Sequence, residues 1–217
     1  NTKLTLIDCS NTKISSLDLS QNTALRTLWC YDSPITELNL TKNAALDVLR
    51  AGGTAITELD LSQNPQLRFF EVNNTGITSL LLENNPNLEW FNIANTQISN
   101  IDLSKQINLK VLYCGNTNIS DLNLINNKLL EHLYCENTKI KDLNISENSH
   151  LKTLFTPNTK LADLNTNNNT NLIILEISNT DISKLNTSHL QSLQLLNISG
   201  TNIESLDVSN NTNLKYL

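Results

Sequence analysis

The chain has no methionine, and it contains few glycines, prolines and aromatic residues: 5 Gly, 4 Pro and 5% aromatic side chains in 217 residues. Without methionine there is no initiator residue, and no signal peptide is visible, so we expect a mature or trimmed piece of a longer protein. No apolar run reaches the ~18 residues that a membrane-spanning helix needs. The sequence therefore predicts no transmembrane segment.

Positive charge and catalytic motifs are scarce as well. The 15 Lys and Arg residues are outnumbered by 21 Asp and Glu, for a net charge of −6. This argues against nucleic acid as a partner, because phosphate binding needs a dense basic face. The sequence has no nucleophile elbow, zinc-binding helix motif, glycine-rich phosphate loop or Ca²⁺ loop. We therefore expect no enzyme activity, no catalytic residues and no cofactor.

What the sequence does contain is a 21-residue repeat that runs from end to end, with leucine always at the leading position. Self-similarity at such a period decides the architecture, because each repeat forms one structural unit that stacks on the next. No linker or shift in composition interrupts the pattern. We therefore predict a single domain over residues 1–217, made of about ten repeats. The leading leucines are Leu4, Leu25, Leu46, Leu67, Leu88, Leu109, Leu130, Leu151, Leu172, Leu193 and Leu214.

Each repeat begins with the alternating pattern of a β-strand. Three residues after the leading leucine comes a second apolar column, from Ile7 to Leu217, and two residues later a column of Cys, Ala, Val, Ile and Thr. A strand that recurs once per coil can pair with its image in the next coil, which predicts a parallel sheet along the solenoid. A Thr or Ser column follows, from Thr12 to Thr201, whose hydroxyl groups we expect to point inward and to bond backbone groups at the turn.

The second half of each repeat reads Leu-Asp/Asn-Leu-Ser, as in 17–20 and 59–62. Its alternation predicts another short strand, closed by an asparagine, and the ten residues between strands leave no room for a helix. In the late repeats Thr166 and Thr187 replace the second leucine. We therefore expect a less regular outer edge between about residues 164 and 192.

The combined pattern L-x-x-L-x-[C/V/I]-x-x-T-x-I is similar to the leucine-rich-repeat signature, with Thr where that family has an inward asparagine ladder. Over essentially every residue the chain resembles the short bacterial leucine-rich repeats, internalin-like in a broad sense. The resemblance implies a mainly β, horseshoe-type solenoid with a parallel sheet on its inner face and short strands or turns instead of helices on its outer face. It also implies an extracellular or cell-surface protein of a bacterium.

Neither end of the chain shows the polar cap that solenoids place over their last apolar coil. Leu4 and Ile7 would face outward at one end, and Leu214 and Leu217 at the other. Trimming of a longer chain is one interpretation. The other is that contacts between copies cover these coils, so we keep end-to-end self-association among the expected interactions.

The four cysteines form two pairs, Cys9 with Cys30 and Cys114 with Cys135, each 21 residues apart in one core column. Zinc sites use close C-x₂₋₄-C spacing, which these pairs lack. Disulfides between in-register neighbours are geometrically awkward. We expect buried free thiols that pack as small apolar groups, and no metal site.

Eight of the ten aromatic residues lie at first-strand positions where side chains point out of the solenoid, whereas the outward second-half positions are acidic, as at Asp60 and Asp102. Trp, Tyr and Arg dominate interface energetics. We therefore predict a non-enzymatic protein-recognition or adhesion site on the first-strand face. The candidate residues are Trp29, Tyr31, Arg50, Phe69, Glu71, Trp90, Tyr113, His132, Tyr134 and Phe155.

Three alternatives stay open at this point. The aromatic residues could stack on sugar rings in a carbohydrate-binding module, if the sheet curves enough to form a groove. They could instead pair across strands only to stabilise the sheet, and the repeat would then be a structural spacer or stalk. Ice binding through the threonine column is a remote further alternative, since that column should point inward.

Overall fold

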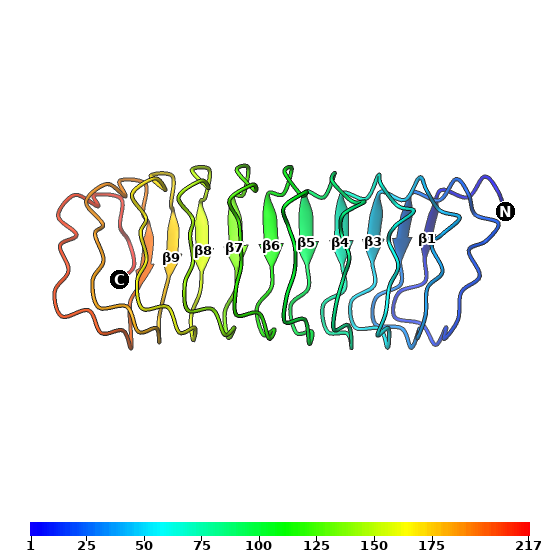
Figure 1. The fold of residues 1–217 in the computed structure, drawn as a ribbon, viewed down its shortest axis with the longest axis horizontal. Helices are drawn as coiled ribbons and strands as arrows, with labels where there is room; N and C mark the ends of the chain where they lie inside the picture. The colour runs from blue at the N-terminus through cyan, green and yellow to red at the C-terminus, as the bar shows by residue number, and fades with distance from the viewer.

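The computed structural model describes residues 1–217 and forms one solenoid with ten β-strands and no helix. Its coils stack side by side from the N-terminus to the C-terminus, and each coil contributes one strand to the same face (Figure 1). The strands are β1 (Leu6–Asp8), β2 (Thr27–Trp29), β3 (Val48–Arg50), β4 (Phe69–Glu71), β5 (Trp90–Asn92), β6 (Val111–Tyr113), β7 (His132–Tyr134), β8 (Thr153–Phe155), β9 (Ile174–Glu176) and β10 (Leu195–Asn197). The predicted mainly β solenoid with a parallel sheet is therefore confirmed.

The sheet pairs the strands in chain order, and every pairing is parallel. Its register always joins residues 21 apart, such as Leu6 with Thr27 and Phe70 with Phe91. Because the repeat has no insertion, each column of the sequence becomes a ladder of side chains along the solenoid. None of the elements is a helix of the length and apolarity that a membrane crossing requires.

The apolar columns fill one continuous core of 48 buried residues. Phe70 and Phe91, the two aromatic residues in core columns, stack with ring centroids 5.4 Å apart. The four cysteines are free and buried, as predicted from their column. Burial raises the pKa of the Cys30 thiol to about 12, which keeps it protonated and apolar in character.

The turn after each strand explains the Asn-Thr pair of the repeat. Asn116 has φ of 55°, in the left-handed region that Asn, Asp and Gly adopt most easily. The next residue, Thr117, donates its hydroxyl hydrogen to the carbonyl of Cys114 at 2.7 Å. The predicted inward hydroxyl ladder is confirmed. The left-handed position is filled by Asn11, Asp32, Gly53, Asn74, Asn95, Asn116, Asn137, Asn158, Asn179 and Gly200.

The predicted second strand of each coil is wrong. The extended segment 101–104 makes no backbone hydrogen bond to a neighbouring coil, and its one backbone bond is the turn from the Gln106 N–H to the Leu103 carbonyl at 3.1 Å. Alternation still directs the leucines inward, but the Asp102 carboxylate accepts the backbone N–H of Ser104 at 2.9 Å. This local turn ends the extended run before a ladder can form.

The asparagine that closes most repeats forms a second inward ladder. Asn127 is fully buried, and its Nδ2 donates to the carbonyls of Leu103 at 3.1 Å and Gln106 at 2.9 Å in the preceding coil. The chain therefore has an inward amide ladder even though threonine occupies the position where the family signature has asparagine. Its members are Asn22, Asn43, Asn64, Asn85, Gln106, Asn127, Asn148, Asn169 and Asn211.

The late coils keep the regular backbone, so the expected irregular outer edge is wrong for the main chain. The Leu190 N–H donates to the Thr187 carbonyl at 2.9 Å, the same bond that the Asn127 N–H makes to Leu124 at 3.0 Å. Only the side chains differ. Leu190 occupies the position of an amide in the second ladder and has no donor to offer. His189 Nε2 lies 2.9 Å from the Thr166 carbonyl, which an amide at position 190 would otherwise reach.

Replacing Asn127 by leucine tests the amide ladder. The variant removes the amide donor from two buried carbonyls, which keep one backbone N–H donor each. A lost hydrogen bond contributes about 0.5–1.5 kcal/mol, so we expect the free energy of unfolding to fall by about 1–3 kcal/mol. Asn127→Gln should lose much less, because Gln106 already fills this ladder and donates to Leu82 at 2.7 Å. Urea denaturation measures both variants. Equal stability of the leucine and glutamine variants would contradict the role of the amide.

Candidate functional site

The outward side of the sheet carries the candidate residues. In the central strands the middle residue is buried and the two flanking residues are half-buried on the opposite side, as in β5, β6 and β7. We call this surface, formed by the outward side chains of β1–β10 and of the residue two positions after each strand, the sheet face. Of the ten predicted residues, Arg50 is exposed and the other nine are half-buried there.

Four aromatic residues of neighbouring strands form a continuous row, which we call the aromatic stack: Trp90, Tyr113, Tyr134 and Phe155. The Tyr113 and Tyr134 rings are parallel within 5° and 4.4 Å apart. Trp90 lies 5.5 Å from Tyr113, and Phe155 lies 5.9 Å from Tyr134, both tilted. The spacing of about 4.8 Å between strands brings such rings into contact. The register of the parallel strands therefore brings four of the predicted residues into contact.

A second group lies nearer the N-terminus. The Arg50 guanidinium is 5.7 Å from the centre of the Trp29 ring, and Arg50 Nε is 3.8 Å from a carboxylate oxygen of Glu71. Burial raises the pKa of Glu71, against the opposing effect of Arg50. Phe69 connects the two groups, because it pairs in register with Trp90. Tyr31 is half-buried just past β2, outside both sets of ring contacts.

His132 lies on the sheet face beside the aromatic stack. Its Nδ1 is 3.0 Å from Thr153 Oγ1, and burial lowers its pKa, so the ring is neutral at neutral pH. His150 and His189 contact main-chain carbonyls in other columns, so the three histidines do not converge. No group of three or more His, Cys, Asp or Glu side chains is placed to hold a metal ion.

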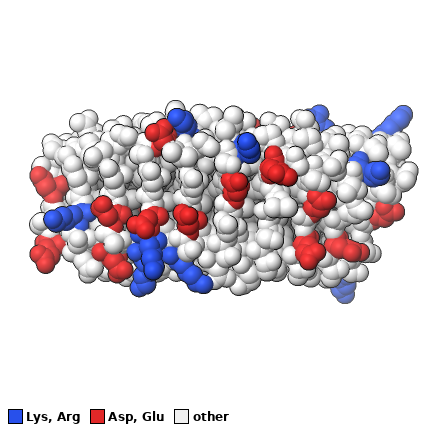
Figure 2. Space-filling view, in the orientation of Figure 1, with Lys and Arg blue, Asp and Glu red and all other residues white.

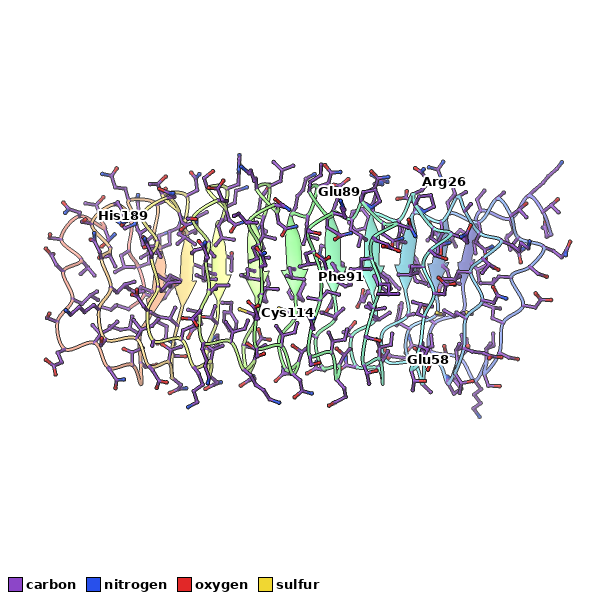
Figure 3. The ribbon with its side chains drawn as sticks, viewed as in Figure 1. Arg26, Glu58, Glu89, Phe91, Cys114 and His189 are labelled. Atoms are coloured by element: carbon purple, nitrogen blue, oxygen red, sulfur yellow. The ribbon has the colours of Figure 1, made fainter.

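A row of charged residues just before the strands was missed by the sequence reasoning. Their signs alternate from coil to coil, so each charge has opposite charges as its ladder neighbours: Arg26, Asp47, Arg68, Glu89, Lys110, Glu131 and Lys152. Arg26 and Glu89 lie along the same margin of the solenoid (Figure 3). The alternating charges are visible in the sequence, in the column that directly follows each leading leucine.

This row, the charge ladder, is held by direct ion pairs. Arg68 Nε is 2.7 Å from an Asp47 oxygen, and Lys110 Nζ is 2.8 Å from a Glu89 oxygen. The hydrogen bond from Arg68 lowers the pKa of Asp47, and the hydrogen bond from Lys152 lowers that of Glu131. The four cations and three anions of the charge ladder leave this margin of the sheet face with a net charge of +1.

The outer side of the coils differs from the sheet face. The predicted acidic residues, such as Asp60 and Asp102, are exposed there. In the view of Figure 2, Asp and Glu are spread along the length of the molecule and Lys and Arg form no broad patch. A cavity of about 750 Å³ is also on this side, lined mainly by polar groups that include Asn165, Asn186 and Ser205. It contains no aromatic residue.

Scans against protein-family models and against curated proteins find no match to this chain. Solved structures do match. The functional domain of InlJ from Listeria monocytogenes, described as including a cysteine ladder, superposes with a TM-score of 0.95 at 28% identity. The superposition covers 99% of this chain and 48% of that one, so the chain spans about half of the InlJ structure.

Two further structures share the fold. Internalin InlF from Listeria monocytogenes has a TM-score of 0.79 at 21% identity, over 97% of this chain and 72% of that one. A complex that contains the FLRT2 leucine-rich repeat matches with a TM-score of 0.78 at 17% identity, over 97% and 73%. The solenoid with its parallel sheet and 21-residue turns matches bacterial internalin-like leucine-rich repeats, as the sequence pattern predicts.

Glu89→Lys tests the charge ladder. The variant places a third cation between Arg68 and Lys110, so we expect the free energy of unfolding to fall by about 1–2 kcal/mol and most of the loss to disappear in about 1 M salt. Glu83→Lys makes the same change six residues earlier in the chain, at an exposed residue that has no ion pair, and it should have little effect. Denaturant unfolding at two salt concentrations measures both. Equal losses in the two variants would contradict the ladder.

Proposed function

We propose that this internalin-like leucine-rich-repeat solenoid is a non-enzymatic recognition or adhesion module that binds a protein partner through its sheet face. The observation that carries the proposal is the aromatic stack, in which Trp90, Tyr113, Tyr134 and Phe155 continue from strand to strand on the outward side. Aromatic side chains offer large contact areas at a low cost in conformational entropy. The neighbouring rings hold one another in place, which further lowers that cost.

The packing of the rings favours a protein over a sugar. Carbohydrate stacking needs an open ring face, but Tyr113 and Tyr134 cover each other at 4.4 Å and present their edges to solvent. The polar cavity lined by Asn165, Asn186 and Ser205 lies apart from these rings, on the outer side. Carbohydrate binding is therefore the second candidate. The FLRT2 leucine-rich repeat, which shares this fold, is part of a complex with Latrophilin 3 and Unc5D.

We also propose an extracellular or cell-surface location in a bacterium. The likeness to InlJ and to internalin InlF supports it. End-to-end self-association belongs to the same proposal, since Leu6, Tyr216 and Leu217 are exposed in the terminal coils. Both statements are secondary to the binding role of the sheet face.

Alanine substitution of Trp90, Tyr113 and Tyr134 together tests the proposed function. A panel of purified host surface proteins and glycans is screened with the wild type, and its binders are then measured with the variant. We expect the Kd of a protein binder to rise at least thirtyfold, roughly the effect of losing one interface residue worth about 2 kcal/mol. The measurement is made at a temperature where both proteins are fully folded.

The matched control replaces Leu81, Ile107 and Ile125 by alanine. These side chains are 83%, 57% and 50% exposed and lie outside the sheet face, so their loss should leave binding unchanged. Equal binding by the aromatic variant and the wild type would contradict the site and favour the spacer alternative. A panel that yields only glycans would favour the carbohydrate alternative.

A further inference from the structure

One acidic residue of the sheet face stands apart from the others. Asp8 accepts the backbone N–H of Ser10, Glu71 faces Arg50, and Glu176 accepts the N–H of Ser178. The Glu136 side chain makes no hydrogen bond and no ion pair within the chain, and its Oε2 is shielded from solvent without a partner. Leaving a carboxylate oxygen in this state costs free energy that an incoming donor would recover.

The position of the Glu136 carboxylate depends on the glycine in the preceding coil. A Cβ atom at Gly115 would lie 2.3 Å from the carboxylate carbon and from one of its oxygens. The missing side chain of Gly115 thus lets the carboxylate lie back across the strand end beside Tyr113. Burial raises the pKa of the Tyr113 hydroxyl, and Tyr134 and then Glu136 raise it further, as expected for groups in one cluster.

The cluster offers acceptors and lacks a cation. The Tyr113 and Tyr134 hydroxyl oxygens and the Glu136 carboxylate lie at the edge of the aromatic stack. The one arginine on the sheet face, Arg50, is four coils from Glu136 and faces Glu71, and His132 is neutral. In the charge ladder along the margin, Lys110 is paired with Glu89 and Lys152 with Glu131. A positive charge at this place therefore has to come from another molecule.

The same arrangement recurs three coils earlier in the same column. Asn73 Oδ1 lies over Gly52, where a Cβ atom would approach it to 2.4 Å, and it too is shielded without a partner. Trp90 and Tyr113 belong to the coils between these two acceptors. At about 4.8 Å per coil the acceptors are roughly 14 Å apart, which an extended peptide spans in about four residues. The spacing fits an extended segment that lies along the solenoid.

We propose that the sheet face recognises a basic side chain of its protein partner, an Arg or Lys in an extended segment, which pairs with Glu136 at the edge of the aromatic stack. This inference rests on the proposed function and adds the chemistry of the partner to it. Arginine suits the site best, because its planar fork can reach a carboxylate and a hydroxyl oxygen at once. Asn73 accepts a second hydrogen bond from the same segment.

Selection from a display library of random linear octapeptides tests the proposal. Peptides are selected on the wild type, and their Kd values are then measured with Glu136→Gln, which keeps the size of the side chain and removes its charge. We expect Arg or Lys to be enriched at one peptide position and the Kd to rise about tenfold with the variant, as for the loss of a charge-assisted hydrogen bond. Glu83→Gln, the same change outside the sheet face, should have no effect.

Gly115→Ala provides a second variant with an intact Glu136. The added methyl group displaces a flexible carboxylate and no backbone, so the fold should be kept while the affinity falls. Failure to select any peptide, or selected peptides without a basic residue, would overturn the proposal. So would equal affinity for wild type and Glu136→Gln. If affinity is lost in the aromatic triple variant but kept in Glu136→Gln, the proposed function survives and this inference fails.

Discussion

The fold depends on the parallel register that joins residues 21 apart in every pair of neighbouring strands. That register turns each position of the repeat into a ladder whose members are about 4.8 Å from one another. A residue is therefore compatible with the solenoid only if it tolerates its own neighbours at that distance. Apolar side chains pack, Asn127 and its equivalents bond to carbonyls of the preceding coil, and Tyr113 stacks on Tyr134. Charged residues must alternate in sign, as Asp47, Arg68 and Glu89 do.

The same constraint separates structure from function. The side chains of the inward ladders form hydrogen bonds to the backbone and fill the core, so few residue types are compatible with these positions. The outward positions are free as long as neighbouring side chains do not repel one another. The row of rings from Trp90 to Phe155 uses this freedom, and its rings stabilise the sheet as well as forming a surface. Glu136 has no such partner within the chain, which is why it points to a ligand.

Much of the fold could be predicted from the sequence, because the leucine period and the strand alternation are direct consequences of stacking. The hydroxyl ladder at Thr117 and the buried thiols also followed from their columns. The second strand could not be predicted correctly, since alternation does not distinguish a paired strand from an extended segment ended by the Asp102 turn. Of the candidate site, the register brings Trp90, Tyr113, Tyr134 and Phe155 into one row. The shielded, unpartnered state of the Glu136 carboxylate could not be predicted, because it depends on how the carboxylate lies over Gly115.

Hydroxyl-radical footprinting of the free protein and of its complex with a selected peptide tests the central claim most directly, because it locates the covered surface without any substitution. The account predicts that oxidation of Trp90, Tyr113 and Tyr134 falls on binding. It also predicts no change at Leu81 and Ile125, which are exposed outside the sheet face. Protection of Leu81 or Ile125 with unchanged oxidation of the aromatic stack would show that the partner binds elsewhere and would contradict the account.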